Sequence, residues 1–485
     1  MSEKKQLVEP RTLKGFQDYL PEDAIARKRV IRTIEGVFEK YGFLPLETPA
    51  LEYLDVLSGT GGDEVNQELF RLESPEGEEI SLRFDLTVPF ARLLAQYPDK
   101  LKVPVRRYAI GPVWRADKPG PGRFRQFTQF DADIAGTDSV AADGEIIAIM
   151  VEIMQTLRAP SYRVLINNRK LIDALLEDCG IHEEASQKHV LRVVDKLDKV
   201  GLDNIRLELG PGRVDDSGDP IPGVQLDGDT IGKILDFVAV KGTSRADIVA
   251  NLGQLLPDTD LSRRALDEMR ELAEVLEGLG VDEDHACFDP SLARGLDYYT
   301  GPVFETIIPK AKEFGSVMGG GRYNGLVGRF LDREIPATGT SVGLDRLMAA
   351  LTKLKVIEPS KTTVQVLVVS LGEIPKAETL RLASELRAAG IRTEAYFGKK
   401  MRMKDQLSHA DRHEIPVAVI LGEDEYARGE VSVKDLLGGK AGKEHIEKRD
   451  EYRKAGKDAQ VTVKRNEMVA NVKRILAGHE SAQAR

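Results

Sequence analysis

Apolar positions recur along this chain with two different periods, and the first third of the sequence shows both. Residues 22–41 carry apolar side chains at helical spacing, which predicts an amphipathic helix. Over residues 80–87, 105–115, 125–135 and 162–168, apolar and polar side chains alternate as they do in strands. Strands that follow one another through hairpins pair antiparallel. We therefore predict an antiparallel sheet that carries helices.

The pattern changes between residues 170 and 285, where helical spacing predominates. A stretch rich in Gly, Asp and Pro at 208–230 interrupts the helical pattern. We expect an inserted, mainly helical module at 170–285, between core segments at 1–169 and 286–354.

Glycine marks two segments of the second core region. A strand pattern at 302–309 is followed by Met-Gly-Gly-Gly at 318–321, which predicts a turn leading into a helix from about residue 323. Gly-Thr-Ser-Val-Gly at 339–343 predicts another turn, which opens into an apolar-striped helix. The N–H groups at a helix N-terminus suit phosphate, and Arg346 would add a positive charge there.

Residues 355–363 have the composition of a linker, and strand and helix patterns alternate beyond them. This alternation predicts a small α/β domain over 364–485 with a mostly parallel sheet. Residues 361–485 hold 24 Lys and Arg against 19 Asp and Glu, whereas the whole chain has a net charge of −10. A basic unit on an acidic body is compatible with a nucleic-acid contact, although a solvated helical face would have the same composition.

Several classes of protein and of site are disfavoured by composition. No apolar run reaches the ~18 residues of a membrane span, and no signal-like apolar segment follows the N-terminus, so we expect a cytoplasmic protein. Cys179 and Cys287 lack C-x-x-C spacing, and the seven histidines show no H-E-x-x-H. We therefore expect no metal site built from a Cys/His cluster. A P-loop is also absent, so a nucleotide site would need another scaffold.

Polar side chains alternate with apolar ones along the predicted strand at 80–87. Arg83, Asp85 and Thr87 would share one face of the strand at 80–87, where the acid and the hydroxyl could hold an ammonium group. A solvated outer face would show the same alternation.

The hairpin from 105 to 135 has the richer polar face. One side of its second strand packs, and the other side carries Arg125, Phe127, Gln129, Asp131 and Asp133. Arginines can form forked bonds to phosphate oxygens, and three lie near the hairpin loop, at positions 115, 123 and 125. Gln129 and Asp133 could accept N–H groups of a polar ligand. The alternative is a solvated hairpin.

Residues 292–305 (Leu-Ala-Arg-Gly-Leu-Asp-Tyr-Tyr-Thr-Gly-Pro-Val-Phe-Glu) place Arg294 four residues before the adjacent Tyr298 and Tyr299. A cation and two aromatic hydroxyls suit a site that holds an anion beside a small polar ring. Without further context, the segment could equally be a loop that leads into a strand.

Taken together, these segments resemble the histidyl-tRNA synthetase family almost end to end. Residues 292–305 and 319–326 (Gly-Gly-Gly-Arg-Tyr-Asn-Gly-Leu) are similar to the two histidine-specific peptides of that family. The segments that resemble the three class II synthetase motifs lie at 42–52, 115–133 and 339–347.

The resemblance implies a class II catalytic domain, with a six-stranded antiparallel sheet and flanking helices. It also implies a homodimer joined partly through the segment at 42–52, and an anticodon-binding domain at 364–485. The implied reaction joins histidine to ATP as histidyl-adenylate, with Mg²⁺ accompanying ATP and pyrophosphate released. The histidyl group then passes to the 3′ end of tRNA(His).

The resemblance also implies roles for individual residues. Arg115 and Arg294 would contact the α-phosphate of ATP and Arg346 the γ-phosphate, with Arg123 and Gly343 also in the ATP site. Histidine would be held by six residues, of which the first three bind its amino side and the others surround the imidazole: Asp85, Thr87, Gln129, Asp133, Tyr298 and Tyr299.

Three alternatives compete with this interpretation. A regulatory paralogue that senses histidine would lack the anticodon domain, and a synthetase for another amino acid would have a different peptide at 292–305. Accidental motif matches in an unrelated α/β protein are the third alternative. The chain also departs from some family members, which have glutamate at the positions of Asp85 and Asp133. Its loop at 119–122 (Pro-Gly-Pro-Gly) differs as well, which leaves open how the acceptor end of tRNA is recognised.

Overall fold

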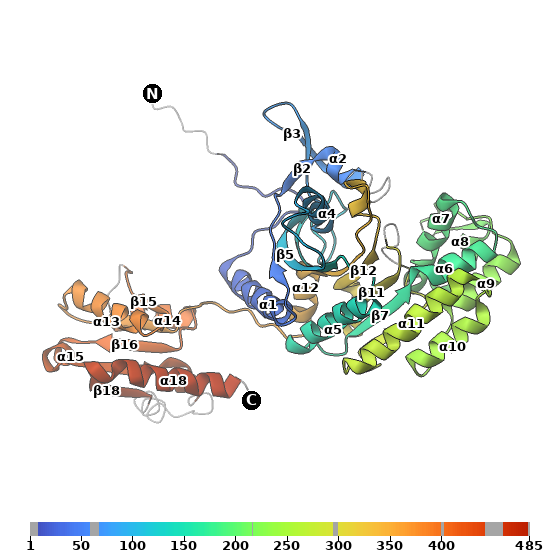
Figure 1. Ribbon diagram of the computed structural model, residues 1–485. Helices are drawn as coiled ribbons and strands as arrows, with labels where there is room; N and C mark the ends of the chain where they lie inside the picture. Colours follow the sequence, from blue (N-terminus) through green and yellow to red (C-terminus); the bar gives the residue numbers. More distant parts are fainter. Residues whose placement is uncertain are drawn as a thin grey trace. The chain divides into compact units, whose positions relative to one another are not determined.

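The computed structural model describes residues 8–58, 67–215, 217–293, 299–398, 402–441 and 459–483. It divides into two compact units, one built on Arg29–Glu358 and the other on Pro359–Arg485 (Figure 1). Each unit has its own sheet and its own apolar core. In the part of the chain that is described, no helix is both long and apolar enough to cross a membrane.

A large sheet of eight strands forms the centre of the first unit. Its inner six strands pair antiparallel, and a short strand is added in parallel at each edge. The predicted six-stranded antiparallel sheet is confirmed in these inner strands. In spatial order the eight strands are β1 (Leu44–Pro45), β5 (Val105–Trp114), β6 (Gln126–Ala135), β13 (Ala337–Gly343), β12 (Met318–Tyr323), β11 (Pro302–Ile307), β7 (Arg163–Asn168) and β10 (Ala286–Phe288).

Three helices cover one face of this sheet (Figure 1): α1 (Pro21–Lys40), α5 (Val140–Thr156) and α12 (Leu344–Lys353). Three even-numbered residues of β6, Phe130, Ala132 and Ile134, belong to the core that these helices share. Phe38 of α1 packs edge-on against Phe130, with 5.1 Å between the ring centroids. The odd-numbered residues of β6 therefore face the other side of the sheet.

The predicted strand at 80–87 is wrong at its second half. A small three-stranded sheet contains β2 (Leu51–Tyr53), β4 (Glu79–Leu82) and β3 (Phe70–Glu73), so the strand ends at Leu82. Beside it lie α2 (Leu54–Leu57) and α4 (Thr87–Gln96). Beyond the strand, Asp85 accepts the backbone N–H of Val88 in the first turn of α4, which starts at Thr87.

Both predicted glycine turns are strands in the middle of the sheet. Residues 318–321 lie in β12 and residues 339–343 lie in β13. Glycine is needed there because the strands approach closely: a Cβ on Gly320 would lie 2.2 Å from the carbonyl oxygen of Gly339. The helix predicted from about residue 323 is also wrong, because β12 reaches Tyr323 and only the short 3₁₀ helix η2 (Val327–Arg329) follows.

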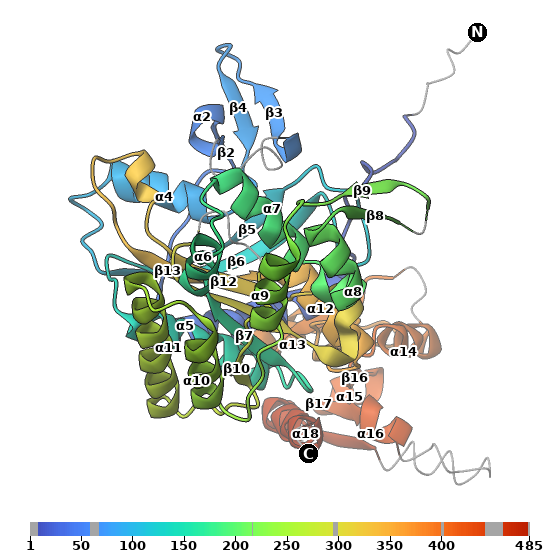
Figure 2. The same ribbon diagram turned by 90° about the vertical axis from the view of Figure 1, so that its right-hand side faces the viewer.

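Between β7 and β10 the chain is mainly helical. Figure 2 shows α9, α10 and α11 side by side, with the β8–β9 hairpin beside α8. Glu208 at the end of α8 is buried and pairs with Lys196 and Arg213, which ties the hairpin to the helices. The elements are α6 (Arg169–Asp178), α7 (Glu184–Val194), α8 (Leu197–Leu209), β8 (Gly212–Val214), β9 (Pro220–Pro222), α9 (Gly228–Val238), α10 (Arg245–Leu255) and α11 (Asp260–Gly278).

The second unit is an α/β domain with a five-stranded sheet. The first three strands pair in parallel, whereas the last two pair antiparallel, so the prediction of a mostly parallel sheet is correct for only half of it. The strands in spatial order are β15 (Thr393–Ala395), β14 (Val366–Ser370), β16 (Val417–Leu421), β17 (Glu430–Asp435) and β18 (Gln460–Lys464). The helices are α13 (Lys376–Ala388), α14 (Met403–Arg412), α15 (Glu423–Arg428), α16 (Leu436–Ala441) and α18 (Met468–Gln483).

Candidate functional site

Two adjoining cavities of about 280 and 270 Å³ lie over the polar face of the large sheet. Arg115, Gln129, Tyr299, Gly319 and Ser341 line both, so the cavities are continuous parts of one site. Strand alternation creates this face, because the odd-numbered residues of β6, β12 and β13 point away from the helix-covered side.

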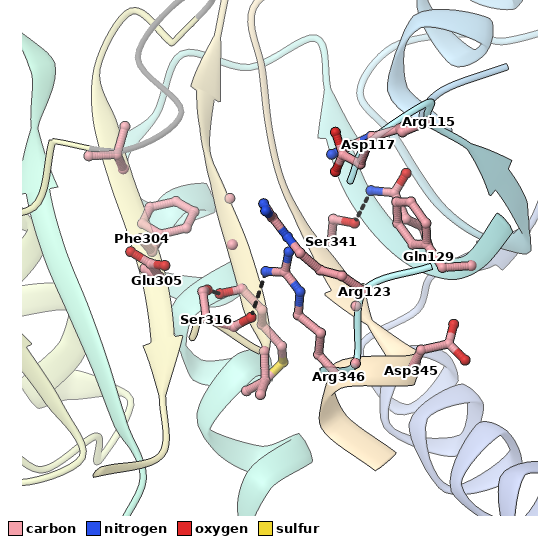
Figure 3. A pocket seen from close by; sticks show the side chains of 18 of the residues that line it. Arg115, Asp117, Arg123, Gln129, Phe304, Glu305, Ser316, Ser341, Asp345 and Arg346 are labelled. Carbon is pink, nitrogen blue, oxygen red and sulfur yellow. Dashed lines mark hydrogen bonds between the residues drawn. The ribbon is translucent and has the colours of Figure 1, made fainter. Parts of the chain in front are cut away.

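Three guanidinium groups line the first cavity. Arg115 follows β5, Arg123 lies in the loop between β5 and β6, and Arg346 lies in the first turn of α12. Figure 3 shows Arg123 and Arg346 projecting into the same space. The Arg346 Nη1 donates to the carbonyl oxygen of Ser316 at 3.4 Å. Like charges converge here only at an electrostatic cost, and an anionic ligand would offset that cost.

Arg115 is oriented by two neighbours. Its Nε donates to the carbonyl oxygen of Phe84 at 3.1 Å, and its guanidinium carbon lies 5.3 Å from the centroid of the Phe127 ring. Arg115 lines both cavities and therefore lies at the boundary between them. Phe127 gives the first cavity a flat apolar wall.

Backbone and carboxylate groups complete the first cavity. Gly343 lies at the junction of β13 and α12, so the N-terminal end of this helix borders the cavity. Asp345 accepts the backbone N–H of Thr128 at 2.8 Å, which fixes the start of α12 against β6. Asp117 and Glu305 also line this cavity.

The second cavity is lined by buried acids and by hydrogen-bonding neutral groups. It contains Asp85, Thr87, Gln129, Asp133 and Tyr299, together with Tyr323. The hydroxyl of Tyr323 donates to Oδ1 of Asp133 at 2.6 Å. Gln129 Nε2 donates to the Ser341 hydroxyl at 2.7 Å, while its Oε1 is buried and has no hydrogen-bond partner among the described residues. This cavity can therefore receive a small ligand that is rich in N–H groups.

Burial changes the acidity of these carboxyl groups. Desolvation raises the pKa of Asp85 to about 6 and that of Asp131 to about 7, and it raises the pKa of Asp133 as well. The positive charge of Arg107 opposes the shift at all three acids. These three carboxyl groups therefore hold their protons more tightly than exposed carboxyl groups do.

Two charged residues of this site had no predicted role. Arg107 is only 1 % exposed, and its Nη2 lies 2.6 Å from Oδ2 of Asp133. Asp131 is also buried and accepts the Thr87 hydroxyl at 3.4 Å. The alternation of 125–135 placed Asp131 on the polar face. Arg107 was missed because its position opposite Asp133 depends on the pairing register of β5 and β6.

Some predicted residues lie elsewhere. Arg83 is buried and bonds the carbonyl oxygens of Thr48 and Pro112, so it supports the backbone beside the site. Arg125 donates to the carbonyl oxygen of Asp117 and is not among the lining residues of either cavity. Arg294 and Tyr298 lie outside the described residues. Within the described ranges, no cluster of three or more His, Cys, Asp or Glu side chains is arranged to hold a metal ion.

Two family models match the chain. The model described as "Histidyl-tRNA synthetase" covers residues 15–347, and the model described as "Anticodon binding domain" covers residues 365–475. The two matches thus fall on the first and the second unit of the structure.

Curated relatives match over almost the whole chain. The histidine–tRNA ligase of Paracoccus denitrificans is 42% identical, covering 98% of this chain and 99% of its own. The histidine–tRNA ligase of Rhizobium meliloti is 41% identical, with 98% and 97% covered.

Solved structures are similar too. The crystal structure of histidyl-tRNA synthetase from Nostoc sp. PCC 7120 superposes with a TM-score of 0.80 at 31% identity, covering 96% of this chain and 100% of its own. A Bacillus halodurans structure described as an ATP phosphoribosyltransferase regulatory subunit/histidyl-tRNA synthetase shares the fold, with a TM-score of 0.70 at 24% identity. It covers 86% of this chain and 99% of its own.

The raised pKa of Asp131 predicts a pH-dependent stability. Because this carboxyl binds its proton more tightly in the folded protein, its contribution to the free energy of unfolding is fully present below about pH 4 and is lost as the pH rises to about 7. Asp131→Asn cannot titrate, so its melting temperature relative to wild type should rise between pH 5 and pH 8. Asp203→Asn, at an exposed position of α8, is the control. A wild-type-to-Asp131→Asn difference that is the same at both pH values would contradict the prediction.

Proposed function

The chain belongs to the histidyl-tRNA synthetase family and is a histidine–tRNA ligase of class II, and we propose that its two adjoining cavities hold ATP and histidine. The observation that supports this assignment is the convergence of three arginines on one cavity, directly beside a cavity lined by buried acids. The first cavity suits a triphosphate, and the second suits an ammonium group and an imidazole.

ATP would occupy the first cavity, with its phosphates among the guanidinium groups. Arg115 borders both cavities and is the group best placed for the α-phosphate, while Arg346 and Arg123 would bind phosphates further from the histidine. Phe127 offers its ring to the base, and Gly343 lets the backbone approach the ligand. We assign Arg294 a second contact to the α-phosphate, on the family resemblance.

Mg²⁺ would enter with ATP. This ion usually binds through one or two carboxylates together with phosphate oxygens, and it keeps several waters. The carboxylates of Asp117 and Glu305 line the ATP cavity, so its donor set fits such an ion. The ion would neutralise part of the charge on the phosphates.

Histidine would occupy the second cavity. Asp85, Thr87 and Gln129 would bind its amino group, and Asp133 with Tyr299 would bind the ring nitrogens. Tyr298 is assigned to the wall of this cavity on the family resemblance. An amino acid without ring N–H groups would leave buried polar atoms unpaired, which gives strong discrimination.

The chemistry of the first step follows from this arrangement. The carboxylate of histidine attacks the α-phosphorus and pyrophosphate leaves, so two anions must be brought together. Arg115 at the boundary of the cavities lowers their repulsion and stabilises the charge that develops on the phosphate. The rest of the catalysis is positioning, because both reactants are held in fixed adjoining sites.

We further propose that the chain is organised as a catalytic core at 1–169 and 286–354, a mainly helical insertion at 170–285, a linker at 355–363 and an anticodon-binding domain at 364–485. The family match that begins at residue 365 supports the last of these. This domain would bind tRNA(His), and the enzyme would act in the cytoplasm.

A homodimer is the proposed assembly. Leu44 of β1 is 67 % exposed and Tyr53 of β2 is 53 % exposed, and Leu51 between them is also exposed. Three large apolar side chains exposed within ten residues are costly in water, and a second copy could cover them. This segment overlaps residues 42–52, which resemble the first class II motif.

The ATP assignment predicts which activity the arginines control. Arg115→Ala and Arg346→Ala should each lower histidine-dependent ATP–pyrophosphate exchange by about a hundredfold or more, because a preorganised charge at the phosphates is lost. Among the twenty amino acids, only histidine should support wild-type exchange. Arg270→Ala is the control, since Arg270 is exposed and pairs with Asp267 on α11. Near-normal exchange by a folded Arg115→Ala enzyme would refute the assignment.

The tRNA assignment predicts a separate defect. Phe397 follows β15 in the second unit and is 76 % exposed, and an exposed ring can stack on an unpaired base. Phe397→Ala should lower kcat/KM for tRNA(His) charging by about tenfold while ATP–pyrophosphate exchange stays unchanged. Tyr426→Ala, at another exposed aromatic of the same domain, is the matched control. Charging that is unaffected by Phe397→Ala would count against a tRNA contact at this residue.

The proposed dimer is tested by light scattering. Tyr53→Asp should shift the protein from dimer to monomer at micromolar concentration, because a carboxylate would be buried in the interface. Leu207→Asp introduces the same charge at another exposed apolar residue, on α8, and should leave the dimer intact. A monomeric wild type, or a dimer that survives Tyr53→Asp, would overturn the proposal.

A further inference from the structure

Arg107 has an unusual position for an arginine. It lies on β5 directly opposite Asp133 of β6 and is 1 % exposed. Its guanidinium carbon lies 4.4 Å from the centroid of the Phe90 ring, so α4 covers one side of the group. A buried guanidinium is stable only with carboxylates or carbonyls around it.

The guanidinium connects the two ends of the histidine cavity. Its Nη2 lies 2.6 Å from Oδ2 of Asp133 and also donates to the carbonyl oxygen of Leu86 at 3.1 Å. Leu86 immediately precedes Thr87, which lines the cavity at the start of α4. The other oxygen of Asp133 accepts the Tyr323 hydroxyl. Arg107 and Tyr323 together therefore fix the orientation of the Asp133 carboxylate.

Arg107 also balances charge. Its field favours the ionised forms of Asp85, Asp131 and Asp133, which are all buried. Among the described residues, its Nε and Nη1 atoms and Oδ1 of Asp131 have no hydrogen-bond partner. The group thus keeps unused donors beside acids that must be ionised to bind an ammonium group.

We propose that Arg107 is a positioning residue for histidine recognition: it holds Asp133 in the orientation that receives the imidazole. The inference rests on the proposed assignment of histidine to the second cavity. If Arg107 had only a structural role, its loss would lower the stability of the fold and would change the KM values for ATP and histidine alike. A positioning residue affects histidine selectively.

The test compares KM values in ATP–pyrophosphate exchange. Arg107→Met should raise the KM for histidine by about a hundredfold, because a buried carboxylate loses its partner. The KM for ATP should stay within about threefold of wild type, because the first cavity is untouched. Arg107→Lys keeps the charge without the fork and should raise the KM for histidine by about tenfold.

A second substitution supplies the decisive readout. Because Arg107 acts through Asp133, the KM for histidine of Arg107→Met/Asp133→Asn should lie within about threefold of that of Asp133→Asn alone. Arg245→Met is the matched control. Arg245 is also buried and donates to the carbonyl oxygens of Val281, Asp282 and Ala286, and it lines neither cavity, so its loss should lower the melting temperature without a selective change in the KM for histidine.

The outcomes separate the inference from the function on which it rests. A wild-type enzyme without histidine-dependent exchange would refute the proposed function itself. With wild-type exchange intact, an unchanged KM for histidine in Arg107→Met would overturn the role of Arg107. An equal rise in both KM values, or additive losses in the double variant, would overturn it as well. Should Arg107→Met not fold, Arg107→Lys decides by the same two KM values.

Discussion

Strand alternation on the large sheet is the constraint on which the rest of the structure depends. Along β6, Phe130, Ala132 and Ile134 enter the core beneath α1 and α5, whereas Phe127, Gln129 and Asp133 line the two cavities. Because the side-chain period of a strand is two, a slip of one residue would bury Gln129 and Asp133 in the core and expose Phe130. The apolar core therefore specifies the register that assembles the site. Alternating residues of β6 therefore serve the stability of the core and the lining of the site.

Charge is distributed across the site so that each cavity complements a different reactant. The first cavity brings three guanidinium groups together, although three carboxylates also lie along its lining, and the second has more buried carboxyl groups than Arg107 can balance. A triphosphate would stabilise the converging guanidinium groups, and an ammonium group would stabilise the buried carboxylates. The Gln129–Ser341 hydrogen bond lies where the two cavities meet, with Arg115 beside it (Figure 3). The chemical step would take place at this boundary, between the guanidinium groups of one cavity and the buried carboxyl groups of the other.

Prediction from the sequence succeeds where neighbouring residues determine the local structure. It is wrong where contacts with distant strands determine it. Alternation over 125–135 identified both faces of β6 correctly. It failed after Leu82. Asp85 accepts a backbone N–H in the first turn of α4, and an acid in this role can also fit an alternating pattern. Residues 318–321 were predicted as a turn because glycine favours turns, whereas close packing between central strands also demands glycine. Arg107 was missed since nothing local indicates that it faces Asp133. The two histidine-specific peptides were informative because each is recognised by its particular residues, and not by a periodic pattern of apolar and polar positions.

The glycines of β12 and β13 show how the acid pocket constrains the sheet beneath it. A Cβ on Gly339 would lie 2.1 Å from Oδ1 of Asp133, the oxygen that accepts the Tyr323 hydroxyl. Alanine at this position would therefore displace the carboxylate from both Tyr323 and Arg107. Gly321 is the register partner of Gly339, and a Cβ there would meet the ring of Tyr299 at 2.9 Å. Two facing glycines thus make room for the acid and the tyrosine that would hold the imidazole. The absence of side chains at these two positions leaves room for the cavity. It also explains why a glycine-rich segment with turn-like composition lies at the centre of the sheet.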